Sequence, residues 1–268
     1  MLVSLMVFLA CGAVAGVLAG LLGVGGGIVI VPMLAFILPL QGVPQDMVQH
    51  LALGTSLASI IVTSISSSRA HNQRGAVRWD IWRAITPGIL LGTFAGGIVA
   101  AHLPTTFLKV FFVCFLYFVA VQMLLGLKPK ASRELPGTVG TSAVGGVIGL
   151  VSSFVGIGGG TLSVPFMSFC NVPMHTAVGT SAAIGFPIAL AGTLGYVVGG
   201  WGVPDLPPYT LGYVYLLAFA GLASASFFTA PLGAKLAHAL PVVTLKRGFA
   251  VFLLIMATRM LWNVLAQG

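Results

Sequence analysis

Charged side chains are scarce in this sequence. Asp, Glu, Lys and Arg make up 6% of the 268 residues, against about 25% in soluble domains, while 58% of the residues are hydrophobic. Apolar runs of about 20 residues, long enough to cross a bilayer as a helix, recur along the whole chain. This composition excludes a soluble domain of useful size and predicts an all-α polytopic membrane protein embedded in a lipid bilayer.

Acidic residues are the rarest charged groups, and Asp46, Asp80, Glu134 and Asp205 all fall in predicted loops or at helix ends. Without a carboxylate inside a span, coupling to a proton or ion would have to use histidines, backbone carbonyls or the substrate's own proton. The sequence also lacks an HExxH motif, a nucleophile elbow and CxxC spacing. We therefore expect no catalytic residues, no cofactor and no metal, and not an enzyme.

Basic residues outnumber acidic ones, 12 to 4, which gives a net charge of +8. In a soluble protein this excess would suggest nucleic acid as a partner. Here the basic residues cluster in the short polar gaps between apolar runs, as they do in membrane proteins whose orientation they determine. We therefore expect no nucleic-acid partner.

Glycine, in contrast, is abundant and concentrated in two matching runs. Residues 23–32 read GVGGGIVIVP and residues 156–165 read GIGGGTLSVP, at an offset of 133. Glycine disfavours helix, and two helix breaks in corresponding halves point to the binding site of a transporter. Their free N–H groups would face an anion, or the glycines would only permit tight packing. The candidate substrate-binding residues are Gly25, Gly26, Gly27, Gly158, Gly159 and Gly160.

A second pair of motifs follows the glycine runs. Residues 50–56 read HLALGTS and residues 175–181 read HTAVGTS, at an offset of 125. The hydroxyls could donate to oxyanion oxygens or bond their own helices. The histidines could carry a coupling proton, contact an anion, or bond backbone at a helix start. These motifs add the candidates Thr55, Ser56, Thr180, Ser181, His50 and His175.

The shared landmarks indicate an internal duplication. We predict an N-terminal transmembrane repeat over 1–127, a linker over 128–137 and a C-terminal repeat over 138–268. There are eight hydrophobic segments, two of them glycine-broken hairpins, which gives about ten helices. Small-residue ridges, such as Gly12-Gly16-Gly20 and Gly88-Gly92-Gly96, fit close helix contacts within one chain or between two copies. A homodimer therefore stays an open alternative.

Positive charges decide between parallel and inverted repeats. If each broken segment crosses the membrane once, the two sides carry eight and four Lys and Arg residues. If each broken segment turns back, the halves are inverted and the count becomes ten against two, with Lys109 and Arg259 alone on one side. The positive-inside rule favours the second arrangement. The sequence therefore predicts inverted repeats.

The motif GxGGGxxxxP in each half, followed by AxGTS and spread over paired hydrophobic repeats, resembles the sulfite exporter TauE/SafE family, also called the toluene sulfonate uptake permeases. The resemblance covers essentially the whole chain. It implies a multi-pass carrier of the bacterial or archaeal inner membrane for small sulfur-containing anions such as sulfite, sulfonates or sulfoacetate.

The leading hypothesis is a secondary transporter that works by alternating access, with the substrate held near the midplane between the two glycine breaks. The alternative is an anion channel on the same scaffold. Counterflow separates the two, because a carrier exchanges substrate across the membrane and a channel does not.

Overall fold

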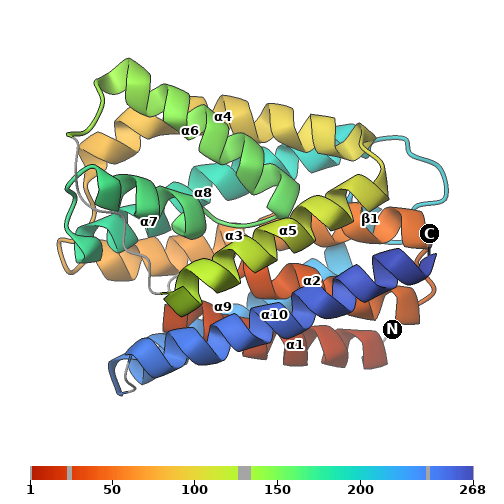
Figure 1. The fold of residues 1–268 in the computed structure, drawn as a ribbon. Coiled ribbons are helices and arrows are strands. Elements are labelled where there is room, and N and C mark those ends of the chain that lie inside the picture. The colour runs from red at the N-terminus through yellow and green to blue at the C-terminus, as the bar shows by residue number, and fades with distance from the viewer. Residues whose placement is uncertain (1, 23–25, 126–133, 240–241, 268) are drawn as a thin grey trace.

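A computed structural model of the chain describes residues 2–22, 26–125, 134–239 and 242–267 (Figure 1). Within these ranges the chain forms ten helices and one short antiparallel hairpin, which confirms the all-α polytopic prediction. The helices are α1 Leu2–Leu22, α2 Gly27–Leu40, α3 Gln45–Asn72, α4 Trp79–His102, α5 Thr105–Leu125, α6 Thr138–Val155, α7 Gly160–Phe169, α8 Met174–Gly199, α9 Leu216–Ala239 and α10 Val242–Gln267. The strands β1 Thr210–Leu211 and β2 Val214–Tyr215 precede α9.

Helix length separates spanning helices from half-length ones. In the described ranges, six helices are long and apolar enough to cross a membrane, namely α3, α4, α5, α6, α8 and the Arg247–Ala266 part of α10. In contrast, α2 has 14 residues and α7 has 10. At about 1.5 Å per residue, both are shorter than a bilayer core of about 30 Å. Each therefore has the length of a half-span that follows a glycine break.

Helices of one predicted repeat pack against helices of the other. The first repeat contains α1–α5 and the second contains α6–α10, yet α1 packs along α9 and α4 packs along α6. The first helix of each repeat thus lies against the fourth helix of the other. The central helices α3 and α8 also pack on each other, as do α5 and α10. Of the predicted linker, residues 128–133 lie outside the described residues.

The small-residue ridges form these inter-repeat contacts, which confirms close packing. A Cβ built on Gly12 would lie 2.7 Å from the Leu222 carbonyl oxygen, and one on Gly88 would lie 1.7 Å from the Ser142 carbonyl oxygen. No side chain fits at either distance, so only glycine allows the backbones to approach. Gly12, Gly16, Gly88, Gly92 and Gly96 of these ridges all meet other helices of the same chain.

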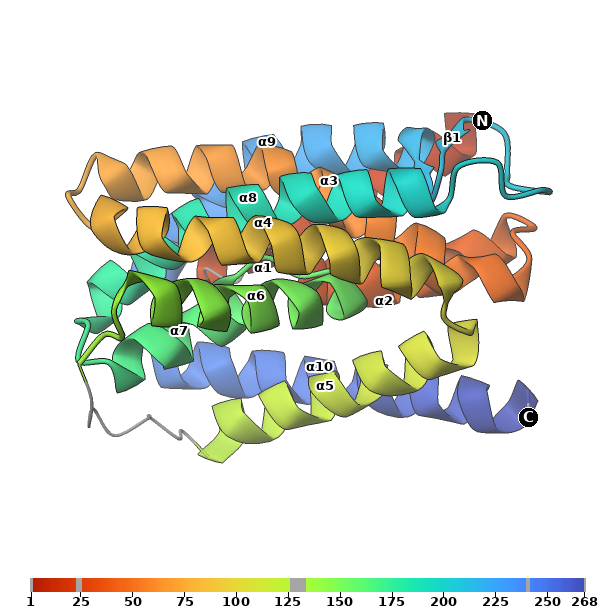
Figure 2. The ribbon, with the colours of Figure 1, turned by 90° about the horizontal axis from the view of Figure 1, so that it is seen from above.

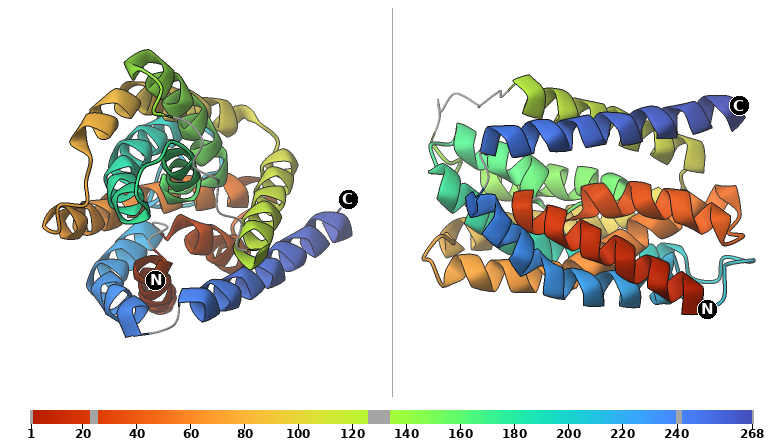
Figure 3. Two further views of the ribbon diagram at one scale, coloured as in Figure 1. Left: turned by 60° about the vertical axis from the view of Figure 1, so that its left-hand side comes forward. Right: turned by 90° about the horizontal axis from the view of Figure 1, so that it is seen from below.

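The ends of the bundle are distinct (Figures 2 and 3). The start of α1, the end of α10 and the β1–β2 hairpin lie at one end, whereas the α3–α4 connection lies at the other. Helix α1 starts at the first end and α6 starts at the opposite end. We call the end that carries the α3–α4 connection, residues 73–78, the basic end.

Helices α3 and α4 extend into the charged segment between them. Helix α3 continues to Asn72 and α4 begins at Trp79, so Arg69 and Arg83 both lie within helices. The hydropathy of the sequence marks where a helix leaves the bilayer core, not where its hydrogen bonding stops. Here the chain turns at Gly75, whose φ of +64° favours glycine.

Candidate functional site

The two glycine breaks touch each other inside the bundle. A Cβ built on Gly27 would lie 2.3 Å from the Gly156 carbonyl oxygen and 2.9 Å from Ile157 Cα. Gly27 and Gly156 are both buried. The first turn of α2 therefore packs directly on the end of α6, with no space for a side chain at Gly27.

Each break turns through a left-handed glycine. Gly156, with a φ of +68°, ends α6, and both its N–H and that of Ile157 donate to the Ser152 carbonyl. Gly26, with a φ of +80°, precedes α2. Only glycine takes this conformation without a steric cost. Gly25, also predicted to bind substrate, lies outside the described residues.

The start of α7 presents free backbone donors. The Gly159 carbonyl accepts hydrogen bonds from the N–H groups of Leu162 and Ser163, at 3.2 and 2.8 Å. Within the described ranges, the N–H groups of residues 158–161 have no backbone acceptor. Unpaired N–H groups at a helix N-terminus carry partial positive charge and bind anions. The predicted glycines 158–160 therefore offer the chemistry expected of an anion site.

Hydroxyl groups surround this helix start. The Ser163 hydroxyl donates to the Gly159 carbonyl at 2.6 Å and lies 3.0 Å from the Ser181 hydroxyl. Thr161 Oγ1 is buried and lacks a hydrogen-bond partner among the described residues. Neither Ser163 nor Thr161 was among the site residues predicted from the sequence. A sequence signal for them existed: at the offset of 133, Thr161 and Ser163 replace Ile28 and Ile30 of the first glycine run, so only the second run carries hydroxyls there.

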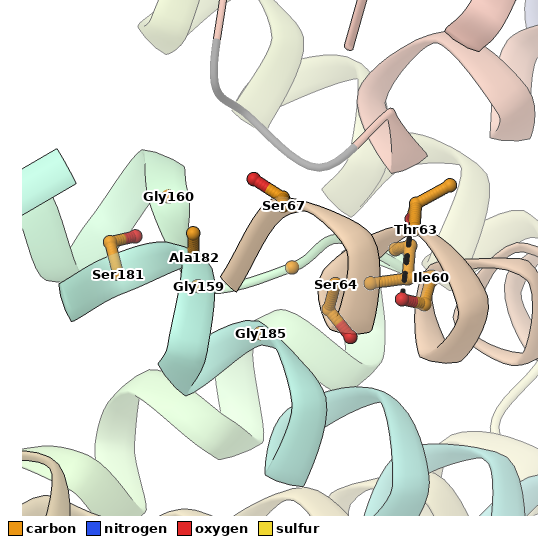
Figure 4. Close-up of a pocket in the computed structure, with 10 residues that line it drawn as sticks. Ile60, Thr63, Ser64, Ser67, Gly159, Gly160, Ser181, Ala182 and Gly185 are labelled. Carbon is orange, nitrogen blue, oxygen red and sulfur yellow. Dashed lines mark hydrogen bonds between the residues drawn. The ribbon is translucent and has the colours of Figure 1, made fainter. Parts of the chain in front are cut away.

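A small cavity lies beside the second break (Figure 4). Its water-accessible volume of about 20 Å³ corresponds to roughly one water molecule. Glycine backbone and hydroxyl groups dominate its polar lining, and no charged side chain contributes. We call it the central cavity. Its lining residues are Ile60, Thr63, Ser64 and Ser67 of α3, Gly158, Gly159 and Gly160 of the break, and Ser181, Ala182 and Gly185 of α8.

Both serines of the GTS motifs lie at the second break. The Ser56 hydroxyl donates to the Gly156 carbonyl at 2.8 Å, which fastens α3 to the end of α6. Ser181 lines the central cavity and contacts Ser163. The structure therefore brings both of these predicted site residues together with the glycines of the second run.

The Gly-Thr pairs of the two motifs make matching contacts across the repeats. Thr55 accepts a 2.9 Å hydrogen bond from the Tyr215 N–H, and Thr180 accepts one of the same length from the Arg78 N–H. A Cβ on the preceding Gly54 or Gly179 would lie 2.4 Å from a carbonyl oxygen of the same extended segments. Both threonines thus anchor the segments that lead into α9 and α4.

The two histidines occupy unlike environments. His50 is buried, with Nε2 3.1 Å from the Leu103 carbonyl oxygen and its ring stacked on Tyr213 at 4.8 Å. His175 is exposed in the first turn of α8. Each is six residues from the serine of its motif, or about 9 Å along the helix axis. The structure does not bring either histidine to the break.

Arginines lie at the basic end, outside the lining of the central cavity. Ser67 lines the cavity, and Arg69 lies two residues further along α3 toward the basic end. Arg78 pairs with Asp80, and this hydrogen bond raises the pKa of the Arg78 guanidinium. An anion that approaches from the basic end would meet arginines first and then backbone and hydroxyl donors.

A polytopic bundle in which two broken helices meet has the architecture of a membrane transporter. The family model described as sulfite exporter TauE/SafE matches residues 8–260. The chain belongs to this family.

Similar proteins carry matching descriptions. A "probable membrane transporter protein" of Haemophilus influenzae is 40% identical over 97% of this chain and 99% of its own length. The probable membrane transporter protein YunE of Bacillus subtilis is 26% identical over 97% of this chain and 98% of its own length. Another probable transporter, from Xylella fastidiosa, is 33% identical over 72% of this chain and 74% of its own length. No solved structure matches the chain significantly. The protein is thus a multi-pass membrane transporter.

Proposed function

We propose that the protein is a secondary transporter for small sulfur-containing anions of the sulfite, sulfonate and sulfoacetate class. The substrate binds near the midplane where the glycine breaks meet. The observation that carries the proposal is the start of α7. Among the described residues, the N–H groups of 158–161 have no backbone acceptor and the buried Thr161 Oγ1 has no hydrogen-bond partner. Buried polar groups are normally paired, and an anion would pair these donors.

The sulfur class of the substrate rests on the family. The description of that family names sulfite export, whereas the described relatives are named only as probable transporters. A site without a lining Lys or Arg favours small oxyanions that take hydrogen bonds from N–H and hydroxyl donors. Glycine and serine also leave such an anion room to reach the backbone.

We further propose that the halves are inverted repeats. Three observations support this arrangement: α1 and α6 start at opposite ends, α1–α9 packing is matched by α4–α6 packing, and the Thr55–Tyr215 hydrogen bond is matched by Thr180–Arg78. The partners in the matched hydrogen bonds differ by 125 and 137 residues, the offsets found in the sequence for these segments.

We infer alternating access from equivalent positions in the two repeats, which would open and close in turn. At an offset of 125, cavity-lining Ser64 and Ser67 correspond to Ala189 and Gly192 of α8. These counterparts are closely packed, since a Cβ on Gly192 would lie 2.8 Å from Leu57 Cδ1. The opposite state would open a cavity beside Ala189 and Gly192 and close the one beside Ser64 and Ser67. The central cavity holds about one water, so α3 and α8 must separate to admit substrate.

Flux into proteoliposomes tests the proposed substrate class. Purified protein is reconstituted and offered sulfite, sulfate, thiosulfate, sulfoacetate and taurine at two pH gradients. We expect at least one sulfur oxyanion to move, and the others to compete in proportion to their resemblance to it. If none of the five moves or competes, the sulfur-anion proposal is wrong. Linear flux without counterflow would instead favour the anion channel.

A further inference from the structure

A second hollow lies at the basic end, between α3, α4 and α8. It has a volume of about 290 Å³, and we call it the lateral groove. The two hollows share no lining residue, but residues adjacent in α3 and α8 line them: Ser64 and Ala182 line the central cavity, and Ile65 and Ala183 line the lateral groove. The lateral groove is lined by Ile65, Ser68, Arg69, Trp79, Trp82, Ala183 and Phe186.

Hydrogen bonds hold the aromatic wall of the lateral groove in place. The Trp82 indole N–H donates to the Ala183 carbonyl at 3.1 Å, and the Trp79 indole N–H donates to Asn72 Oδ1 at 3.0 Å. The two indole rings meet edge to face, with centroids 5.6 Å apart. The wall is therefore preformed, with both indole N–H groups satisfied and the ring surfaces left for apolar contact.

The rim of the lateral groove is cationic. Arg69 is exposed, and the one ion pair among the described residues joins Arg78 to Asp80. Asp80, next to Trp79, is therefore already neutralised, whereas Arg69 has no carboxylate partner. The Ser68 hydroxyl adds a donor beside it. A phosphate would find a charge and a hydrogen-bond donor at one place.

We propose that the lateral groove binds an anionic phospholipid. Its phosphate would lie against Arg69 and Ser68, and an acyl chain would pack along Ile65, Phe186 and the indoles. The apolar lining favours a lipid over a free anion, because a free anion gains nothing from it. The tryptophans in the first turn of α4 also fit a headgroup-level position, where aromatic residues collect in membrane proteins.

Tryptophan quenching by brominated lipids tests this site. Replacing exposed Trp201 and Trp262 by Phe leaves Trp79 and Trp82 as the only tryptophans. The protein is reconstituted in phosphatidylcholine with small amounts of brominated phosphatidylglycerol or brominated phosphatidylcholine. One basic residue near anionic lipid contributes about 1 kcal/mol, so we expect about five-fold higher occupancy by phosphatidylglycerol.

Variants test which residue causes the preference for phosphatidylglycerol over phosphatidylcholine. Arg69→Gln should remove this preference and Arg69→Lys should keep it. Arg74→Gln, at the same end but outside the lateral groove, should leave it unchanged. Ser68→Asp, which places a negative charge at the rim, should also remove it and serves if Arg69→Gln does not fold. Monodisperse elution in detergent establishes folding for each variant.

Three outcomes would overturn the lipid site. Equal quenching by both lipids would show that the lateral groove has no charge preference. An equal loss in Arg69→Gln and Arg74→Gln would assign the preference to general surface charge. Relief of the phosphatidylglycerol quenching by millimolar inorganic phosphate, at constant ionic strength, would identify a free-anion site instead.

Discussion

Thr180 accepts a 2.9 Å hydrogen bond from the backbone N–H of Arg78, 102 residues away in the sequence. Its counterpart joins Thr55 to Tyr215 at the same distance. The glycine before each threonine lets a carbonyl of the extended segment approach to within contact of the helix. The Gly-Thr pairs therefore anchor each repeat to the other, next to the serines that reach the second break.

Replacing either threonine by valine should destabilise the protein. Thr180→Val or Thr55→Val removes the acceptor and leaves a partly buried backbone N–H unpaired, which costs about 1–3 kcal/mol. Thermal unfolding in detergent measures the loss. Thr193→Val is the matched control on α8, because the hydroxyl of Thr193 donates to the Ala189 carbonyl of its own helix and, in the described part of the chain, to no other repeat. Equal losses in Thr180→Val and Thr193→Val would contradict an anchoring role.

Gly27→Ala should separate the two breaks. The added methyl would lie 2.3 Å from the Gly156 carbonyl oxygen, which is backbone and cannot rotate away. We expect a lower unfolding temperature and loss of flux. Gly248→Ala in α10 is the control, since a Cβ built there would meet no neighbouring helix within 4 Å among the described residues, and alanine favours helix by about 0.5–1 kcal/mol. Normal flux in Gly27→Ala would mean that the breaks need not touch.

Thr161→Val should separate stability from transport. The variant replaces a buried, unpartnered hydroxyl by a methyl group of similar size, which removes a desolvation cost of about 1–3 kcal/mol. We expect an equal or higher unfolding temperature together with a raised KM for the transported anion, because the site loses a donor. Unchanged KM in the stabilised variant would assign the hydroxyl to packing alone.

Cysteine accessibility tests the exchange of cavities. Cys11, Cys114 and Cys170 are first replaced by serine or alanine, and single cysteines are then placed at Ser67 or Ala189. A membrane-impermeant thiol reagent should modify Ser67→Cys from the basic side, and Ala189→Cys only from the other side. Saturating substrate should change the two rates in opposite directions. Modification of both cysteines from the same side would contradict inverted alternation.

The sequence predicted the large features of the fold because these depend on local composition. Apolar runs located the helices, and glycine runs located both breaks. The small-residue ridges anticipated the close approach of Gly12 and Gly88 to neighbouring backbones. Periodicity and composition are properties of short segments, and they can be read without knowing which distant segment packs against them.

The details of the site depended on distant partners. Thr55 and Thr180 looked like substrate donors, because the segments that they hold lie 160 and 102 residues away. His50 and His175 are equivalent in the sequence, yet only His50 meets an aromatic ring, that of Tyr213. Equivalent residues in a repeat share a backbone position but not the side chains packed against them.

Sulfite counterflow tests the central claim, that an anion binds where the glycine breaks meet. Proteoliposomes loaded with unlabelled sulfite are diluted into a trace of radiolabelled sulfite. The native protein should accumulate label transiently above equilibrium. Gly159→Leu should abolish this accumulation, because its side chain would fill the cavity that Gly159 lines. Membrane insertion and monodisperse elution establish that the variant folds. Accumulation in Gly159→Leu equal to that of the native protein would contradict a site at the break.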